Sequence, residues 1–511
     1  MRRRRFIFAS VAAGVTATAG CAELLGVGDD EPTPSPNGQA DSGPTEELDA
    51  LLEPGRTVEF TNIPLAASVP DGSFKTDDGI VVAVDIIEPA TEIGPAILRM
   101  GLQNTRSFGQ PFELGRTGIL DHPPWTEANG TNLLVLPADS RPIGERATLP
   151  VTDTMYRWRP DSLMGPFYPE YLHLEAEETL IADFYLLSEA TPTSAPFGPG
   201  RYTFEGDEPI TISIWDHEAP GPSGQSRFDD TTVPSPQKDM AISWYHEATD
   251  QTEVYLQPAT EFSELPTALE FEVVNYSSEP VDGRLGNMNL YKFDGSEWFD
   301  LTPNFELPYH GQIVIPELPT LDHHEPALPI DVGERTTVYP GDTATAPVMF
   351  NQQEGIEHEN MLVAHFLGNG RYAIESEYQY DGAHLATMFE LDGPALEVEP
   401  EADATLDVDI DAVTVELPTG PWAIEPVEVV VEQSISEGFD FRVIPEQLYQ
   451  AKFRSLRNSI PLFDMESVET VRVIGPHQLV EPFQEADTGS LKVEFEGGFY
   501  QMTASVRDQT D

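Results

Sequence analysis

One proline-rich stretch gathers the residues best suited to hold a metal ion. The candidate ligands are consecutive: Asp322, His323, His324 and Glu325. Imidazole and carboxylate groups suit zinc or copper, and His310, His358 and His365 are not far away in sequence. Adjacent residues rarely converge on one ion, so the alternative is a polar surface loop. We predict no cofactor and keep this quartet as the candidate metal site.

A second stretch has the composition of a binding surface. Residues 156–172 read YRWRPDSLMGPFYPEYL and are dense in aromatic residues and arginine, which are enriched at the centres of protein interfaces. The candidate contact residues are Tyr156, Arg157, Trp158, Arg159, Phe167, Tyr168 and Tyr171. The alternative is a small aromatic core that covers one end of the surrounding domain.

No recognisable motif for catalysis is present. The sequence has no nucleophile elbow, phosphate-binding glycine loop, HExxH pair or dinucleotide fingerprint. Acid and base roles cannot be assigned among 88 Asp and Glu residues without geometry. We therefore predict no catalytic residue. Two N-glycosylation acceptors occur, at Asn129 (Asn-Gly-Thr) and at Asn275 (Asn-Tyr-Ser).

The N-terminal residues have the order of an export signal. Arg2 to Arg5 precede the apolar run Phe6–Ala19, and the only cysteine of the chain is Cys21. The sequence RRRFI (3–7) resembles the twin-arginine pattern, and TAGC (18–21) resembles a lipobox. The resemblance implies a lipoprotein exported by the Tat route, with a signal peptide at 1–20 and a lipid on Cys21. That lipid would hold it at the extracellular face of the membrane.

The residues after the expected cleavage site predict a spacer. Residues 28–49 are rich in Pro, Ser, Thr, Gly and acidic residues, a composition that does not bury enough apolar surface to fold. We therefore expect a disordered spacer over residues 21–54, which would separate the folded part from the membrane.

The charge balance excludes one class of partner and points to a habitat. The chain carries 88 acidic against 27 basic residues, a net charge of −61, so it would repel nucleic acid. Removing residues 1–20 leaves a net charge of −65, because four arginines are lost. Only five lysines occur. This acidic, lysine-poor composition, together with the signal, is similar to secreted proteins of halophilic archaea, in which salt screens the repulsion.

Two stretches of the chain repeat each other and set the domain plan. Residues 95–115 align with 266–286 without a gap, and FGPGRY (197–202) matches LGNGRY (367–372). The offsets are 171 and 170 residues, so we expect two diverged copies of one domain. The predicted boundaries are 55–215 for repeat 1, 216–239 for a linker, 240–400 for repeat 2 and 401–511 for a C-terminal domain.

The fold class follows from short alternating segments between Pro and Gly turns. Such segments predict a mainly β protein, with two tandem β-sandwiches and a β-rich α+β C-terminal domain with one helix over residues 445–458. The repeats resemble immunoglobulin-like domains and, loosely, the BsuPI type of proteinase inhibitor. We expect Asn104 to be equivalent to Asn275, and Tyr202 to Tyr372, with both tyrosines candidates for a tyrosine corner.

The predicted function is a non-catalytic binding or structural module in the cell envelope. Its partners would be the membrane, through the lipid anchor, and an extracellular protein or glycan. Two alternatives stay open: an extracellular enzyme or enzyme subunit with a cryptic carboxylate site, and a histidine-based metal-binding lipoprotein.

Overall fold

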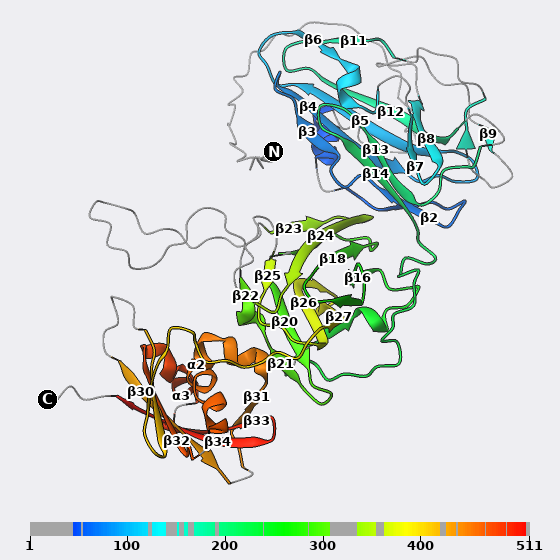
Figure 1. The fold of residues 1–511 in the computed structure, drawn as a ribbon. Helices are drawn as coiled ribbons and strands as arrows, with labels where there is room; N and C mark the ends of the chain where they lie inside the picture. The colour runs from blue at the N-terminus through cyan, green and yellow to red at the C-terminus, as the bar shows by residue number, and fades with distance from the viewer. Residues whose placement is uncertain are drawn as a thin grey trace, which may run out of the picture. The chain divides into compact units, whose positions relative to one another are not determined.

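The strands and short helices form three successive β-rich regions, seen along the chain in Figure 1. The computed structural model describes residues 44–52, 55–120, 125–138, 151–152, 158–161, 168–189, 194–238, 240–284, 286–306, 335–353, 362–418, 426–435, 438–465, 467–486 and 488–506. The prediction of a mainly β protein is confirmed. No helix in these ranges is both long and apolar enough to cross a membrane.

Repeat 1 is built from two main sheets around one apolar core. The core comes from inward side chains of both sheets, such as Leu98, Phe184 and Ile212, none of which is more than 1% exposed. The first sheet has the order β3 (Ser73–Lys75), β4 (Ile80–Glu88), β5 (Ala96–Asn104), β12 (Thr179–Ser188), β8 (Thr131–Pro137) and β7 (Trp125–Ala128). The second has the order β1 (Val58–Glu59), β2 (Leu65–Ser68), β14 (Ile210–Asp216) and β13 (Gly200–Phe204). A two-stranded ribbon joins β11 (Tyr171–Leu174) to β6 (Gln110–Glu113).

Repeat 2 is also built from two main sheets and a two-stranded ribbon. One sheet runs β16 (Val254–Pro258), β18 (Thr267–Asn275), β24 (Asp342–Phe350), β25 (Leu362–Ala364) and β22 (Phe305–Glu306). The other runs β15 (Ile242–Trp244), β27 (Ala383–Asp392), β26 (Gly370–Tyr380), β20 (Met288–Phe293) and β21 (Trp298–Asp300). The strand β17 (Phe262–Glu264) also pairs with β27, and β19 (Val281–Gly283) pairs with β23 (Thr336–Val338).

The pairing of strands supports the sequence repeat. In repeat 1, β5 lies between β4 and β12, and in repeat 2, β18 lies between β16 and β24. The ribbon of β6 and β11 corresponds to that of β19 and β23, and the hairpin of β13 and β14 to that of β26 and β27. Asn104 ends β5 and Asn275 ends β18, so these two residues occupy equivalent strands as predicted. The likeness to immunoglobulin-like domains stays a prediction.

Both asparagines have the same structural duty. The side-chain amide of Asn104 donates to the carbonyl oxygens of Phe108 (2.9 Å) and Glu175 (2.8 Å). That of Asn275 donates to the carbonyl oxygens of Glu279 and Val338, both at 2.8 Å. Both side chains are fully buried, and each fixes the turn after its strand by bonding a carbonyl four residues later. A buried amide with its hydrogen bonds satisfied stabilises the turn, whereas an unsatisfied one would be costly.

The C-terminal domain is a mixed seven-stranded sheet with short helices packed on it, an α+β arrangement as predicted. The sheet order is β28 (Thr405–Val408), β29 (Ala412–Glu416), β32 (Thr470–Gly475), β30 (Val427–Ser434), β34 (Gly498–Val506), β33 (Ser490–Phe495) and β31 (Phe441–Val443). Its core joins strand valines to helical residues such as Leu448, Leu456 and Leu479, all fully buried.

The prediction of one continuous helix over residues 445–458 is wrong. The segment consists of the 3-10 helices Pro445–Tyr449 and Ala451–Phe453, followed by α2 (Arg454–Arg457). Gln450 interrupts them with an extended backbone, φ −75° and ψ 144°. This break lets its side-chain amide donate to the carbonyl oxygen of Asp300 and to Oδ1 of Asn304, both at 3.0 Å. Further 3-10 helices lie at Ile460–Asp464 and His477–Val480, and α3 spans Glu481–Glu485.

Two segments expected to lack packing are in fact packed. Within the predicted spacer 21–54, Pro44–Leu51 form the helix α1, which buries Leu48 and Leu51 against repeat 1. There is room for Leu48 because Gly101 has no side chain: a Cβ on Gly101 would lie 2.5 Å from Cδ1 of Leu48. Within the predicted linker 216–239, Phe228 is 2% exposed and packs with Trp244 and Met388. Composition alone did not predict this packing, because one or two apolar residues are enough to anchor a segment when a sheet face lies beside it.

Candidate functional site

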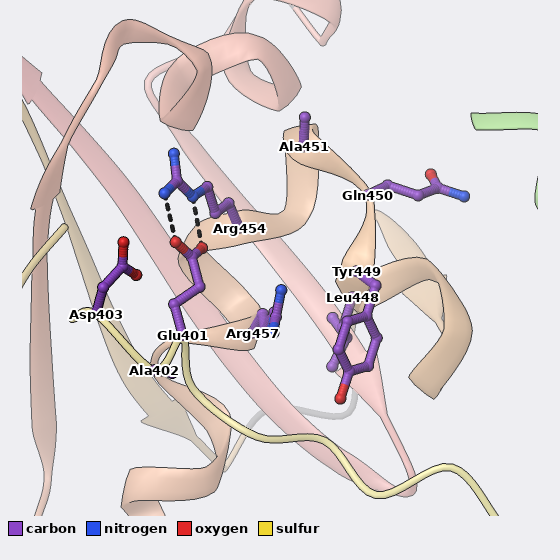
Figure 2. A pocket seen from close by; sticks show the side chains of 9 residues that line it. All are labelled: Glu401, Ala402, Asp403, Leu448, Tyr449, Gln450, Ala451, Arg454 and Arg457. Atoms are coloured by element: carbon purple, nitrogen blue, oxygen red, sulfur yellow. Dashed lines mark hydrogen bonds and ion pairs between the residues drawn. The ribbon is translucent and has the colours of Figure 1, made fainter. Parts of the chain in front are cut away.

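A pocket that could hold a small molecule lies in the C-terminal domain. Its volume is about 540 Å³, within the usual range for ligand sites. We call it the Arg457 pocket, and it is drawn in Figure 2; its lining residues are Glu401, Ala402, Asp403, Leu448, Tyr449, Gln450, Ala451, Arg454 and Arg457. They come from the chain just before β28 and from the helical segment 448–457.

A forked ion pair forms one wall of this pocket. Nε and Nη2 of Arg454 donate to the two carboxylate oxygens of Glu401, as the dashed lines in Figure 2 show. Asn458 donates from Nδ2 to Oε1 of Glu401 at 3.0 Å and accepts the backbone N–H of Glu401 at 2.9 Å. Burial alone would raise the pKa of Glu401, but the hydrogen bonds from Arg454 and Asn458 hold it below its ordinary value. Glu401 is therefore a fixed carboxylate and not a proton donor near neutral pH.

A stack of flat groups forms the other wall. The guanidinium of Arg457 lies 4.2 Å from the ring centroid of Tyr449. Tyr449 in turn stacks on Phe366, with centroids 4.2 Å apart and planes at 11°. Two backbone carbonyls hold the stack in place, since Nε of Arg457 donates to Glu399 (3.0 Å) and the Tyr449 hydroxyl donates to Glu397 (2.8 Å). Among the described residues, Nη1 and Nη2 of Arg457 have no hydrogen-bonding partner in the protein.

A second, shallower pocket of about 420 Å³ lies in repeat 2 beside the start of β26. Its arginine is already paired, since Arg371 lies 3.5 Å from Glu390, which also binds Arg227 at 3.0 Å. Asp294 at its rim accepts hydrogen bonds from two backbone amides and from Arg442, which outweigh burial and lower its pKa to about 2. Arg371, Glu390 and Asp294 are therefore each already paired within the protein.

Among the described residues, the carboxyl group whose pKa is raised toward neutrality lies outside both pockets. Burial of Asp85 in β4 raises its pKa to about 6, and its neighbours are the backbone N–H of Ile86 at 2.8 Å and Nε of Arg56 at 3.8 Å. Asp85 lines neither of the two pockets. General acid–base catalysis needs such a group within reach of a bound substrate, and the Arg457 pocket instead presents paired ions and stacked rings.

The predicted aromatic surface is partly core. Tyr168 is 5% exposed and its hydroxyl donates to the carbonyl oxygen of Val135, so it does not face a partner. Trp158 is half-buried and donates from Nε1 to the carbonyl oxygen of Thr91 at 2.9 Å. Arg159 is half-buried, whereas Tyr171 is 55% exposed. Tyr156, Arg157 and Phe167 lie outside the described residues. Aromatic packing inside repeat 1, the alternative considered above, therefore accounts for Trp158 and Tyr168.

The two glycosylation candidates differ sharply. Asn275 is fully buried with its amide engaged, so the folded protein does not expose it to a glycosyltransferase. Its modification stays a prediction that would require glycosylation before folding. Asn129 is exposed in the turn between β7 and β8, with φ 51°, and its amide donates to the carbonyl oxygen of Pro199 at 3.0 Å. Its modification stays a prediction.

Cys21 and the quartet Asp322, His323, His324 and Glu325 lie outside the described residues. His365 is buried, with Nδ1 2.9 Å from the carbonyl oxygen of Gln353. Within the described residues, no three His, Cys, Asp or Glu side chains are grouped to hold a metal ion.

The Arg457 pocket was missed because its walls are distant in sequence. Glu401 and Arg454 are 53 residues apart. One signal was available: the segment AKFRSLR (451–457) holds three of the 27 basic residues in a strongly acidic chain, two residues after Tyr449. A local gathering of arginine and tyrosine against the overall charge is typical of a recognition site.

Comparison with known proteins does not identify the chain. No family model matches it, and no curated protein matches it. A solved structure of a polysaccharide lyase aligns with 62% of this chain and 34% of its own, at 8% sequence identity and a TM-score of 0.12. The alignment thus spans about a third of the length of that lyase, and a likeness of this size carries no conclusion about fold or function.

Proposed function

We propose that this chain is a non-catalytic binding protein of the cell envelope of a halophile, tethered at the extracellular face of the membrane by a lipid on Cys21. The order of arginines, apolar run and single cysteine supports the tether. The excess of 88 acidic over 27 basic residues supports the saline habitat. Tandem β-rich repeats followed by a domain with an open pocket suit a protein that presents a binding site.

One observation carries the binding role: four residues at the Arg457 pocket, three of which line it, are already oriented by contacts within the protein. Arg454, Asn458 and Glu401 hold one another, and Arg457 lies flat on Tyr449. Groups that are already oriented lose little entropy when a ligand arrives, which favours affinity. Because the pKa of Glu401 is lowered, this wall contributes charge and shape and not proton transfer.

The tether is tested by fractionating cells that express the natural chain or the Cys21→Ser variant. We expect the natural chain in the membrane fraction and the variant in the medium or in unprocessed form. Equal membrane association and equal processing of both forms would overturn the tether.

The binding role is tested with the soluble Cys21→Ser form and isolated cell envelopes in molar KCl. We expect saturable co-sedimentation that the Arg457→Gln substitution weakens. The matched control is Arg472→Gln, because Arg472 pairs with Glu428 at 2.9 Å in the sheet and does not line the pocket. Equal sedimentation of all three proteins would remove the pocket from the binding role.

A further inference from the structure

We infer that the Arg457 pocket binds a small hydroxy acid, with the ligand carboxylate on Arg457 and its hydroxyl group on Asp403. This inference deepens the proposed binding function and rests on it. It follows from which polar atoms of the pocket are engaged and which are open.

Arg457 is the open cationic group. Its Nε donates a hydrogen bond to the carbonyl oxygen of Glu399, and its guanidinium plane lies over the ring of Tyr449. Within the described part of the chain, Nη1 and Nη2 have no hydrogen-bonding partner in the protein. These two nitrogens form a planar fork that matches the two oxygens of a carboxylate. Because the stack fixes the plane of the fork, a bound carboxylate costs little side-chain entropy.

Arg454 is a poorer anchor although it lines the same pocket. Nε and Nη2 are both committed to Glu401, which leaves only Nη1. A ligand that displaced Glu401 from Arg454 would leave the Glu401 carboxylate without its charged partner. This carboxylate also accepts a hydrogen bond from Asn458 and is partly buried, so leaving it unpaired would be costly. The ion pair therefore acts as a wall, and the second arginine receives the ligand.

Asp403 is the second polar contact proposed for the ligand. It lines the pocket, is exposed, and has no hydrogen-bonding partner among the described residues. A carboxylate accepts hydrogen bonds only, so it favours a ligand group that donates, such as a hydroxyl. Ala402, Ala451 and Leu448 also line the pocket and add apolar surface. The volume of about 540 Å³ accommodates a small molecule.

The charge of the whole chain makes such a site specific. With a net charge of −61, most of the surface repels an organic anion, so a carboxylate that binds must find a local cation. At molar salt the Debye length is about 3 Å, which removes the long-range repulsion but leaves a direct two-point hydrogen bond in place.

The test uses the soluble Cys21→Ser chain in molar KCl and three probes of similar size, followed by ligand-observed NMR titration. Lactate has the carboxylate and the hydroxyl, propionate lacks the hydroxyl, and lactamide lacks the charge. We expect lactate to bind best, propionate several-fold more weakly, and lactamide at least tenfold more weakly. Equal binding of lactate and lactamide, or no binding of lactate, would overturn the inference.

Variants separate the two contacts. Arg457→Gln should weaken lactate at least tenfold, and Arg457→Lys should rescue only part, because the planar fork is lost. Asp403→Asn should reduce the preference of lactate over propionate while Arg472→Gln changes nothing. An unaltered lactate affinity in Arg457→Gln contradicts the assignment. If Arg457→Gln fails to fold, the comparison of lactate with lactamide on the unsubstituted pocket decides alone.

The failure of this inference can be told from the failure of the proposed function. Loss of lactate binding with intact envelope sedimentation would mean that the ligand class is wrong and the binding role stands. Envelope sedimentation that ignores Arg457→Gln, together with normal lactate binding, would mean that the pocket serves a small molecule and not envelope attachment.

Discussion

The hydroxyl of Tyr372 donates a hydrogen bond to the carbonyl oxygen of Gly368, four residues earlier, at 2.7 Å. Tyr202 makes the same bond to Gly198 at 3.0 Å. Both tyrosines are fully buried and both are the third residue of their strand, β26 and β13. The two contacts thus pin the chain as it enters the same strand of each repeat.

Replacing either tyrosine by phenylalanine should lower the free energy of unfolding by about 1–2 kcal/mol. In Tyr372→Phe the buried carbonyl of Gly368 loses its donor, and in Tyr202→Phe the half-buried carbonyl of Gly198 and the hydroxyl of Thr131 both lose a partner. Tyr171→Phe is the matched control, since Tyr171 is 55% exposed and should change stability by less than about 0.5 kcal/mol. Denaturant unfolding in molar KCl measures all three. A silent Tyr372→Phe variant would mean that the corner is not a stabilising contact.

Asp85 should make stability fall as pH rises from 4 to 6. Its pKa is about 6 in the fold, where burial opposes the charge, against an ordinary value of 3.8. Between these values the carboxyl group of Asp85 is ionised in the unfolded chain and protonated in the folded chain. The folded state therefore binds more protons than the unfolded state, so the free energy of unfolding falls as the pH rises. Above pH 6 the full cost remains, at most about 3 kcal/mol for a shift of about two units.

Asp85→Asn should therefore stabilise the protein at pH 7 by about 1–2 kcal/mol. It should also remove this part of the pH dependence, since the amide can still accept the N–H of Ile86. Urea unfolding of both forms at pH 4 and pH 7 measures it, and the difference between the forms isolates Asp85 from the other carboxyl groups. A variant that is less stable at pH 7 would contradict the prediction.

The predictable part of the fold lay where a pattern is local. The alternation of apolar and polar residues in β5 and β18, each ending in asparagine, predicted both strands and the turns that follow them. Helix α1 was not predicted because it has only two buried apolar residues. Their packing depends on the absence of a side chain at Gly101. Gln450 broke the expected helix because its partners, Asp300 and Asn304, belong to repeat 2.

The site was less predictable than the fold. Composition singled out Trp158 and Tyr168, whose large apolar surfaces serve packing as readily as binding. Only the fold brings Glu401 to Arg454 and Phe366 to Tyr449. Such tertiary pairs leave no periodic trace in a single sequence.

Glycosylation should be confined to one of the two acceptor sites. In a host that modifies Asn-x-Ser/Thr, Asn129→Gln should abolish a glycan-dependent mass shift and Asn275→Gln should leave it unchanged, because Asn275 is fully buried. Intact-mass spectrometry reads out both. Asn275→Gln should also reduce stability, since a longer side chain cannot reproduce the bonds to Glu279 and Val338. A glycan on Asn275 would require modification before folding.

Salt should stabilise the chain strongly. The mature protein would carry 88 acidic and 23 basic residues, and screening of their repulsion favours the compact state. The thermal midpoint should rise by several degrees or more between 0.1 M and about 3 M KCl. A midpoint that does not change over this range would remove the argument for a saline habitat.

Filling the space at Gly101 should release α1. Gly101→Val would introduce a Cβ only 2.5 Å from Cδ1 of Leu48 and 3.3 Å from Cδ1 of Leu51, so both leucines would have to move. We expect faster cleavage after Glu46 and Glu47 by a glutamate-specific protease. Gly224→Val is the control, because a Cβ there meets nothing within 4 Å. Equal cleavage rates would show that α1 does not depend on this contact.

The attachment of α1 also determines how the protein responds to force. In the described residues, α1 is joined to its sheet by side chains alone: Leu48 and Leu51 on the Gly101 face, and Glu47 with Arg99 at 3.3 Å. No backbone hydrogen bond links it to β4 or β5, whereas those strands share a long antiparallel ladder. We therefore expect a pull from the N-terminal side to detach α1 first and to extend its eight residues before any strand ladder bears the force. We expect α1 to yield under tension before the strands of repeat 1 bear a shear force.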